Sequence, residues 1–190
     1  SAMGPLASLV AWAETRHDEI RAARAQFDAA AARLASPEGR LYVVGGRITR
    51  SLAEYAFTHF QAIRARVTHL TSSSATWPHY VLDMTEGDTL LIFDIRRYEE
   101  NLLRLAEIAQ ARGMQVILIT DQWSSPIASV AAHTFNCWVE IPSAWDSNIA
   151  TLSLVEALVA AAQEHRWPEA RDRFERLDAL FELTRLFRKP

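Results

Sequence analysis

The stretch LLIFDIRRYEENLLRLAEIAQARGMQVILITD, residues 90–121, contains two buried strands and the helix between them. Residues 90–94 and 115–120 are short apolar runs, which are typical of strands buried on both faces of a sheet. Between them, residues 98–112 place apolar side chains on one helical face, and Gly113 is expected to end that helix. A strand, a helix and a second strand in this order predict two parallel strands joined by a helical crossover.

The same alternation extends over most of the chain. Further strands are predicted over residues 41–44, 66–70 and 135–141, and further helices over 49–63, 77–85 and 146–165. Helical patterns also precede and follow this core, over residues 6–35 (as one long helix or two shorter ones) and 168–187. We therefore expect an α/β protein: a three-layer, doubly wound sandwich with a five-stranded parallel sheet flanked by helices. In such folds, ligands bind at the carboxyl ends of the strands.

Composition excludes several classes of protein. The 190 residues are enough for one domain with a full core, and a net charge of −3 lacks the basic excess of a nucleic-acid binder. The single cysteine, Cys137, allows no internal disulfide and no cysteine-based metal site, and is expected to be a small buried hydrophobe in a reducing cytoplasm. No apolar run reaches the roughly 20 residues that span a bilayer. No sequence motif indicates a cofactor or a metal, so neither is predicted.

The turn after the strand at 41–44 is the first candidate binding place. Gly45 and Gly46 leave the strand, and Thr49 lies where the next helix starts. Free backbone N–H groups and the helix dipole attract an anion to such a place, and Arg47 and Arg50 add donors. The alternative is that Thr49 only caps the helix and that the arginines are solvated.

The second candidate is the turn after residues 90–94, where Arg96 and Arg97 stand at the start of a helix. Cations are unfavourable there unless something negative pairs with them. Asp94, Glu99 and Glu100 are the nearest partners in sequence, and would form a local ion-pair cluster. The other interpretation is a guanidinium fork that binds a phosphate or carboxylate. We expect one arginine to belong to the cluster and the other to face a ligand.

The third candidate is the turn after residues 115–120, with Asp121, Ser124 and Ser125. Ser125 is expected to cap the short helix that Pro126 opens. Trp123 is expected to be exposed, where it can stack on a ligand or a partner.

Taken together, these turns resemble the sugar isomerase (SIS) domain over about residues 36–165. More narrowly, they are similar to the effector domain of the RpiR/MurR class of bacterial transcriptional regulators. The family's I-T-D-x-x-x-S-P-(L/I)-A stands as ITDQWSSPIA at 119–128. Its G-x-G-x-S-x-x-x-A is matched by Gly45, Thr49 and Ala53, with Arg47 in place of the second glycine.

The chain departs from the family where S-x-S-G-x-T normally holds the phosphate of a phosphosugar. Here residues 93–98 read FDIRRY, so that long cations and the phenol of Tyr98 replace the small hydroxyls. Either the arginines bind the anion by charge, or they fill the pocket and leave it without that ligand. The predicted ligand-binding residues are Gly45, Arg47, Thr49, Arg50, Asp94, Arg96, Arg97, Tyr98, Ser124 and Ser125.

The resemblance implies an effector-sensing domain that binds a small anionic sugar metabolite and forms dimers or tetramers. It implies contact with DNA only through a helix-turn-helix domain absent from this chain, and no contact with a membrane. Residues 1–4 (SAMG) are interpreted as an expression remnant, residues 5–35 as a connector, and residues 36–190 as the SIS domain with its C-terminal helix. One alternative is an aldose–ketose phosphosugar isomerase, for which Glu156 and His79 are the only candidate bases. Another is an assembly module that binds no ligand.

Overall fold

The computed structural model of the protein describes residues 5–71 and 73–185, with side chains described for residue 12 and from residue 14 onward. The predicted remnant at residues 1–4 and the last two residues of the helix predicted over 168–187 lie outside this description.

Five parallel strands form one sheet in the order β2-β1-β3-β4-β5. They are β1 (Leu41–Gly45), β2 (Val67–His69), β3 (Thr89–Asp94), β4 (Gln115–Asp121) and β5 (His133–Cys137). The chain places β2 on one side of β1 and then crosses to place β3 on the other side. The strand order therefore reverses at β1 and β3, and the crevice for a ligand lies outside their carboxyl ends.

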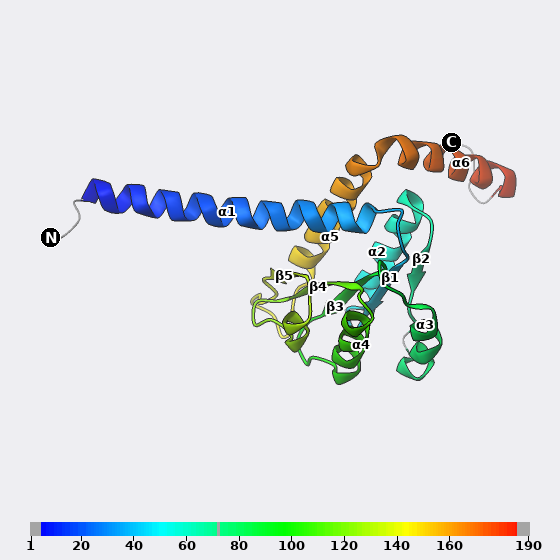
Figure 1. Cartoon of the computed structure of the whole chain (residues 1–190), viewed down its shortest axis with the longest axis horizontal. Helices are drawn as coiled ribbons and strands as arrows, with labels where there is room; N and C mark the ends of the chain where they lie inside the picture. Colours follow the sequence, from blue (N-terminus) through cyan, green and yellow to red (C-terminus); the bar gives the residue numbers. More distant parts are fainter. Residues whose placement is uncertain (1–4, 72, 186–190) are drawn as a thin grey trace.

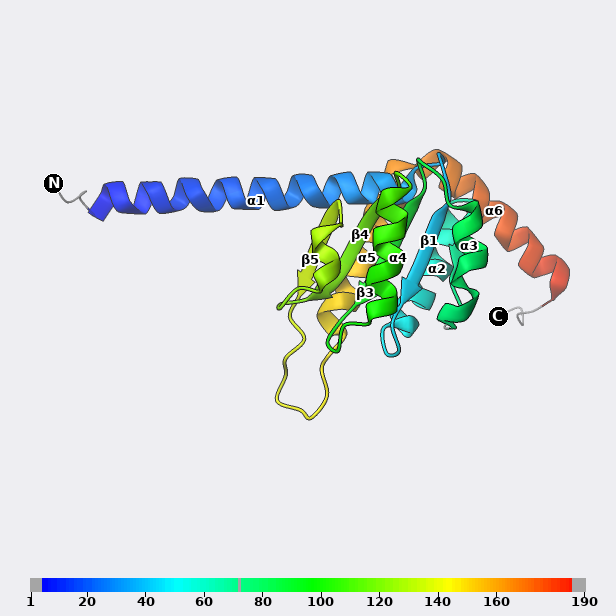
Figure 2. The same cartoon turned by 60° about the horizontal axis from the view of Figure 1, so that its bottom comes forward.

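Helices cover both faces of the sheet, as Figure 2 shows. Alternate residues of β3 point to opposite faces, so that Leu91 and Phe93 belong to one core and Leu90 and Ile92 to the other. The first core packs against α1 (Pro5–Ala35), α2 (Arg50–Ile63), α5 (Ile149–His165) and α6 (Trp167–Thr184). The second packs against α3 (Trp77–Asp83), α4 (Glu100–Ala111) and η2 (Pro126–Ser129), while the short η1 (Ser74–Thr76) leads into α3 and contributes no buried residue. The predicted three-layer fold is confirmed.

The first helix is one continuous element and projects far beyond the sheet (Figure 1). Its last turns are anchored because Ala30, Ala31 and Leu34 are buried in the first core. The side chains of residues 14–25 are all exposed. Within the described residues, no helix combines the length and the apolar character that crossing a membrane requires.

The predicted strand at 135–141 is wrong in its bounds. Asp121, the last residue of β4, pairs with Cys137, so the edge strand β5 loses its only neighbour beyond that point. Residues 138–148 instead form a long loop that extends from the sheet in Figure 2; we name it the 138–148 loop. Val139 is buried between two exposed residues, and this alternation imitates a strand. Cys137 is buried as predicted, and burial raises the pKa of its thiol.

Candidate functional site

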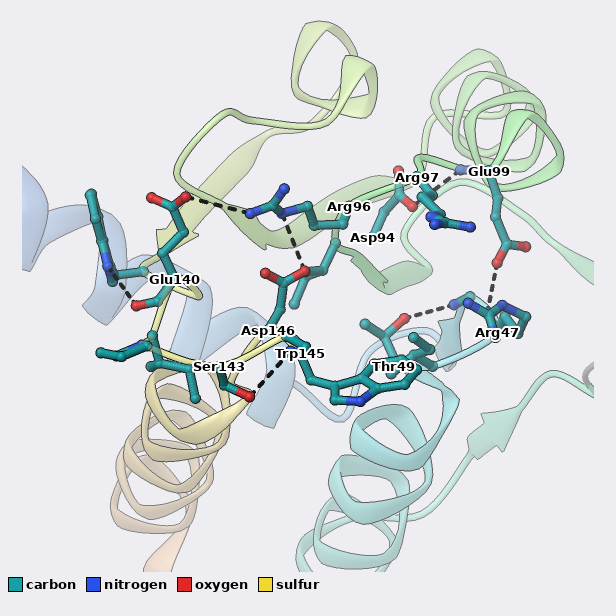
Figure 3. Close-up of a pocket in the computed structure, with 17 residues that line it drawn as sticks. Arg47, Thr49, Asp94, Arg96, Arg97, Glu99, Glu140, Ser143, Trp145 and Asp146 are labelled. Atoms are coloured by element: carbon teal, nitrogen blue, oxygen red, sulfur yellow. Dashed lines mark hydrogen bonds and ion pairs between the residues drawn. The ribbon is translucent and has the colours of Figure 1, made fainter.

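An open cavity of about 780 Å³ lies at the carboxyl ends of β1 and β3, where the strand order reverses. The turn after β1 and the turn after β3 form one wall, and the 138–148 loop forms the other (Figure 3). A cavity therefore lies at the edge of the sheet where the topology predicts ligand binding. Nine of its 17 lining residues are polar or charged, and the others include two tryptophans, Trp138 and Trp145.

The turn after β3 has an unusual backbone, because Arg96 and Arg97 both adopt left-handed conformations, with φ of 43° and 46°. Each such residue costs about 1–2 kcal/mol. The turn is held by the buried carboxylate of Asp121, which accepts hydrogen bonds from the Arg96 N–H and the Tyr98 hydroxyl, both at 2.7 Å. Burial and the bond to Asp121 raise the pKa of Tyr98, so its hydroxyl remains a donor. Tyr98 therefore builds the turn and does not line the cavity.

The floor of the site is a hydrogen-bonded group around Asp94. Its carboxylate accepts hydrogen bonds from the Ser125 hydroxyl and the Glu99 N–H. Burial raises the pKa of Asp94, and these two bonds partly offset that effect. Ser125 also accepts a hydrogen bond from the Ile127 N–H, which confirms the predicted cap. Ser124 and Ser125 lie outside the lining of the cavity.

Arg96 is bound by the loop on the opposite wall. Its guanidinium lies 3.2 Å from a carboxylate oxygen of Asp146 and 3.7 Å from one of Glu140 (Figure 3). It also stacks at 4.1 Å from the ring centroid of Trp123, a residue that is half exposed. The sequence predicts a local ion pair with Asp94, Glu99 or Glu100 for one of the two arginines; Arg96 does not make it, because the 138–148 loop brings Glu140 and Asp146 closer.

Arg47 and Arg97 are the cavity's unpaired cations. Both side chains are exposed and line the cavity, and neither has a carboxylate partner among the described residues. Glu100, the other predicted partner, instead pairs with Arg104. In Figure 3, Arg47 and Arg97 lie with Glu99 at one end of the cavity, while Arg96 lies at the other end with its two carboxylates.

The turn after β1 already holds an anion, which is the carboxylate of Glu99. The Arg47 N–H donates to Glu99 Oε1 at 2.6 Å. A Cβ atom on Gly46 would lie 2.6 Å from the same oxygen, so the close approach requires glycine at position 46. Thr49 does not cap the helix with its side chain: its hydroxyl accepts from the Gly46 N–H at 2.8 Å and donates to the Phe93 carbonyl at 2.9 Å.

A smaller cavity of about 340 Å³ lies on the other side of Glu99. Gly45 and Arg50, predicted for the main site, line only this smaller cavity, whereas Arg47 and Glu99 line both. Of the ten predicted residues, the main cavity therefore brings together Arg47, Thr49, Asp94, Arg96 and Arg97.

Sequence reasoning missed the second wall of the site. Trp138 and Glu140 lie in the predicted strand at 135–141, Asp146 lies at the start of the predicted helix at 146–165, and Trp145 lies between the two, whereas the structure has a loop over all four. Two tryptophans and two carboxylates around Pro142 were the available signal, because buried strands seldom carry such residues. The roles of Glu99 and Asp121 depend on contacts between separate turns.

The two candidate catalytic bases lie elsewhere. Glu156 is exposed on α5 and accepts a hydrogen bond from the Tyr55 hydroxyl at 3.0 Å. His79 is exposed on α3. Neither residue lines the main cavity or the smaller one. Across residues 5–71 and 73–185, no group of three or more His, Cys, Asp or Glu side chains is arranged to hold a metal ion.

A parallel α/β sheet with a cavity at its switch point defines an α/β domain with a candidate small-molecule site. The chain belongs to the SIS domain family, whose model matches residues 34–161. No curated protein shows significant sequence similarity to the chain.

Solved structures share this fold. The sugar isomerase domain of an RpiR transcription factor from Sphaerobacter thermophilus has a TM-score of 0.74 at 20% identity, covering 81% of this chain and 86% of that one. NanR of Vibrio vulnificus, complexed with ManNAc-6P, has a TM-score of 0.71 at 15% identity, covering 96% and 70%. The protein c3406 of E. coli CFT073, in complex with A5P, has a TM-score of 0.65 at 15% identity, covering 93% and 100%. At these identities the likeness establishes the fold alone.

Proposed function

We propose that this SIS domain senses a phosphosugar or a related anionic sugar metabolite, as the effector domain of a bacterial transcriptional regulator of the RpiR class. The observation that carries the proposal is the pair of exposed arginines, Arg47 and Arg97, in a hollow at the switch point of the sheet. A guanidinium without a carboxylate partner binds phosphate or carboxylate through charge-assisted hydrogen bonds. Trp145, 73% exposed at the rim, offers an apolar face to a sugar ring.

The path from the cavity to the rest of the molecule supports a sensing role. The 138–148 loop lines the cavity and leads directly into α5, and α5 packs along α1. A ligand that shifts this loop therefore acts on the helix that projects from the domain (Figure 1). In this proposal α1 is the connector to a DNA-binding domain outside this chain.

Self-association is part of the same proposal, as a dimer or tetramer. Large apolar side chains are exposed on the two outer helices, namely Trp12 and Ile20 on α1 and Leu180 and Leu183 on α6. A second copy that covers these side chains would remove their apolar surface from water. Light scattering coupled to size-exclusion chromatography tests this part by the mass of the particle.

One observation favours a second candidate, an assembly module without a ligand. The chain's own carboxylates already occupy donors at this edge of the sheet: Glu99 accepts from the Arg47 N–H, and Asp121 accepts from the Arg96 N–H. Because internal carboxylates occupy these N–H donors, fewer donors are left to bind an external anion.

A thermal-shift screen of sugar phosphates and sugar acids separates the two candidates. A ligand at 100 times its Kd adds about 2.7 kcal/mol to the free energy of unfolding. For a chain of this size, that increment raises Tm by roughly 5–10 °C. Neutral glucose is the control compound. The variant tested is Arg97→Ala, which removes one of the two exposed cavity arginines. Its control is Arg171→Ala, which removes an exposed arginine on α6. If no anionic sugar raises Tm, the sensing proposal fails and the assembly module is favoured.

A further inference from the structure

The charges around the cavity do not suit a simple dianion. Three guanidinium groups (Arg47, Arg96 and Arg97) and four carboxylates (Asp94, Glu99, Glu140 and Asp146) line it. A phosphate monoester carries about −1.5 to −2 at pH 7. Attraction to the arginines is therefore opposed by repulsion from the carboxylates unless the carboxylates have other partners.

Three of the four carboxylates do have such partners. Glu140 and Asp146 both bind the guanidinium of Arg96, and Asp94 is buried beneath the cavity with its hydrogen bonds to Ser125 and to the backbone. Glu99 is different, because its one hydrogen-bond donor is the neutral N–H of Arg47. In the described part of the chain, no cationic side chain lies within ion-pair distance of Glu99.

Hydrogen bonds to Arg47 and Asp94 also position Glu99 in the site. Its backbone N–H donates to Asp94, and its carboxylate lies against Gly46. Any residue with a Cβ at position 46 would crowd this carboxylate. It lines both the main cavity and the smaller one, as do Gly46 and Arg47. The unpaired charges that line this end of the cavity are therefore two guanidiniums and one carboxylate (Figure 3).

We infer that Glu99 determines the class of ligand: a sugar derivative that carries an ammonium group as well as an anionic group, such as an amino sugar phosphate. Arg47 and Arg97 bind the phosphate, and Glu99 binds the ammonium group. The same carboxylate repels a sugar phosphate that has only a hydroxyl at that position. This inference rests on the proposed function, since it concerns the ligand of the same cavity.

The test compares binding of glucosamine 6-phosphate, glucose 6-phosphate and inorganic phosphate by isothermal titration calorimetry at pH 7. The proteins are the unmutated chain, Glu99→Gln and Glu100→Gln. Glutamine keeps an oxygen that can accept from the Arg47 N–H, so that Glu99→Gln removes charge and little else. Glu100→Gln makes the same change one residue along, on a side chain that pairs with Arg104 and lines neither cavity.

The unmutated chain is expected to bind glucosamine 6-phosphate about tenfold more tightly than glucose 6-phosphate, as one added charge-assisted hydrogen bond predicts. In Glu99→Gln the order reverses: glucosamine 6-phosphate weakens, while glucose 6-phosphate and inorganic phosphate bind more tightly. A variant with a damaged site would weaken all three, so the opposite signs identify electrostatic selection. Glu100→Gln keeps the original order.

Two results would overturn the inference, and they are distinguishable. If both sugar phosphates bind the unmutated chain and Glu99→Gln with the same ratio of affinities, the selection by Glu99 is refuted and the proposed function stands. If none of the three compounds binds any of the proteins, the inference is refuted, and the thermal-shift screen of sugar phosphates and sugar acids then decides the proposed function separately.

Discussion

Arg96→Ala is expected to weaken the fold, whereas Arg97→Ala is expected to weaken only ligand binding, although the two residues are adjacent and share a backbone conformation. Arg96 makes ion pairs to Asp146 and Glu140 and stacks on Trp123. Exposed ion pairs contribute about 0.2–1 kcal/mol each, and an exposed cation–π contact about 0.5–1 kcal/mol. Because the Arg96 side chain is 44% exposed, we place the total near the low end, at about 1–2 kcal/mol.

Arg97 has no such contacts among the described residues, so its removal should change the free energy of unfolding by less than about 0.5 kcal/mol. Its loss should instead weaken the binding of a sugar phosphate by about 1.5–3 kcal/mol, as expected for hydrogen bonds to a charged group. That corresponds to roughly 10- to 150-fold in Kd.

Urea unfolding followed by far-ultraviolet circular dichroism measures the first quantity, and calorimetric titration of a sugar phosphate measures the second. The effect of Arg96→Ala on stability should shrink in 1 M NaCl, where the Debye length is about 3 Å and exposed ion pairs are screened. Arg171→Ala, which removes an exposed ion pair on α6, gives the baseline for losing one surface charge. Equal destabilisation by Arg96→Ala and Arg97→Ala would refute the assignment, as would loss of binding in Arg96→Ala alone.

Two further predictions concern the turn after β1 and the acid stability of the fold. A Cβ at Gly45 would lie 2.5 Å from the backbone carbonyl oxygen of Thr49, whereas one at Gly46 would lie 2.6 Å from Glu99 Oε1, at the end of a flexible side chain, and 3.4 Å from Leu102 Cδ1. Gly45→Ala should therefore cost about 1–3 kcal/mol or more in urea unfolding. Gly46→Ala should cost less than about 1 kcal/mol while shifting ligand preference as Glu99→Gln does. Comparable losses of stability in the two glycine variants would contradict this. Burial lowers the pKa of His69, whose buried Nε2 has no hydrogen-bond partner in the described chain. The unfolded state therefore binds a proton at His69 more readily than the folded state does. As a result, the free energy of unfolding should fall as pH drops below about 6.5. His69→Phe should reduce that slope in unfolding titrations between pH 7 and 5, and an unchanged slope would count against the assignment.

The local sequence pattern predicted secondary structure and helix caps correctly where these depend on neighbouring residues. The apolar run at β3 and the one-sided pattern of α4 predicted a strand and a helix, because burial on two faces or one face imposes those periods. Ser125 before Pro126 predicted a helix cap, which is also a local feature because the cap bonds to the backbone two residues further on. The β5 prediction failed because the end of an edge strand depends on where its neighbour stops.

The candidate site was predicted only in part. The sequence indicated the edge of the sheet and placed Arg96 and Arg97 there, because the carboxyl ends of parallel strands meet at one edge. It predicted that one arginine pairs with Asp94, Glu99 or Glu100 and that the other faces a ligand, but neither makes an ion pair with those carboxylates in the described chain. Arg96 binds the far wall, and Arg97 faces the cavity.

By itself, the sequence determined the alternation of strands and helices, and with it an α/β sandwich whose turns carry polar groups. Only the tertiary structure decided which charges meet. Glu99 reaches the N–H of a residue 52 positions earlier, and the 138–148 loop folds back onto Arg96. The physical reason is that periodicity is a property of neighbouring residues, whereas these contacts depend on the order in which strands lie side by side and on the backbone angles of two turns.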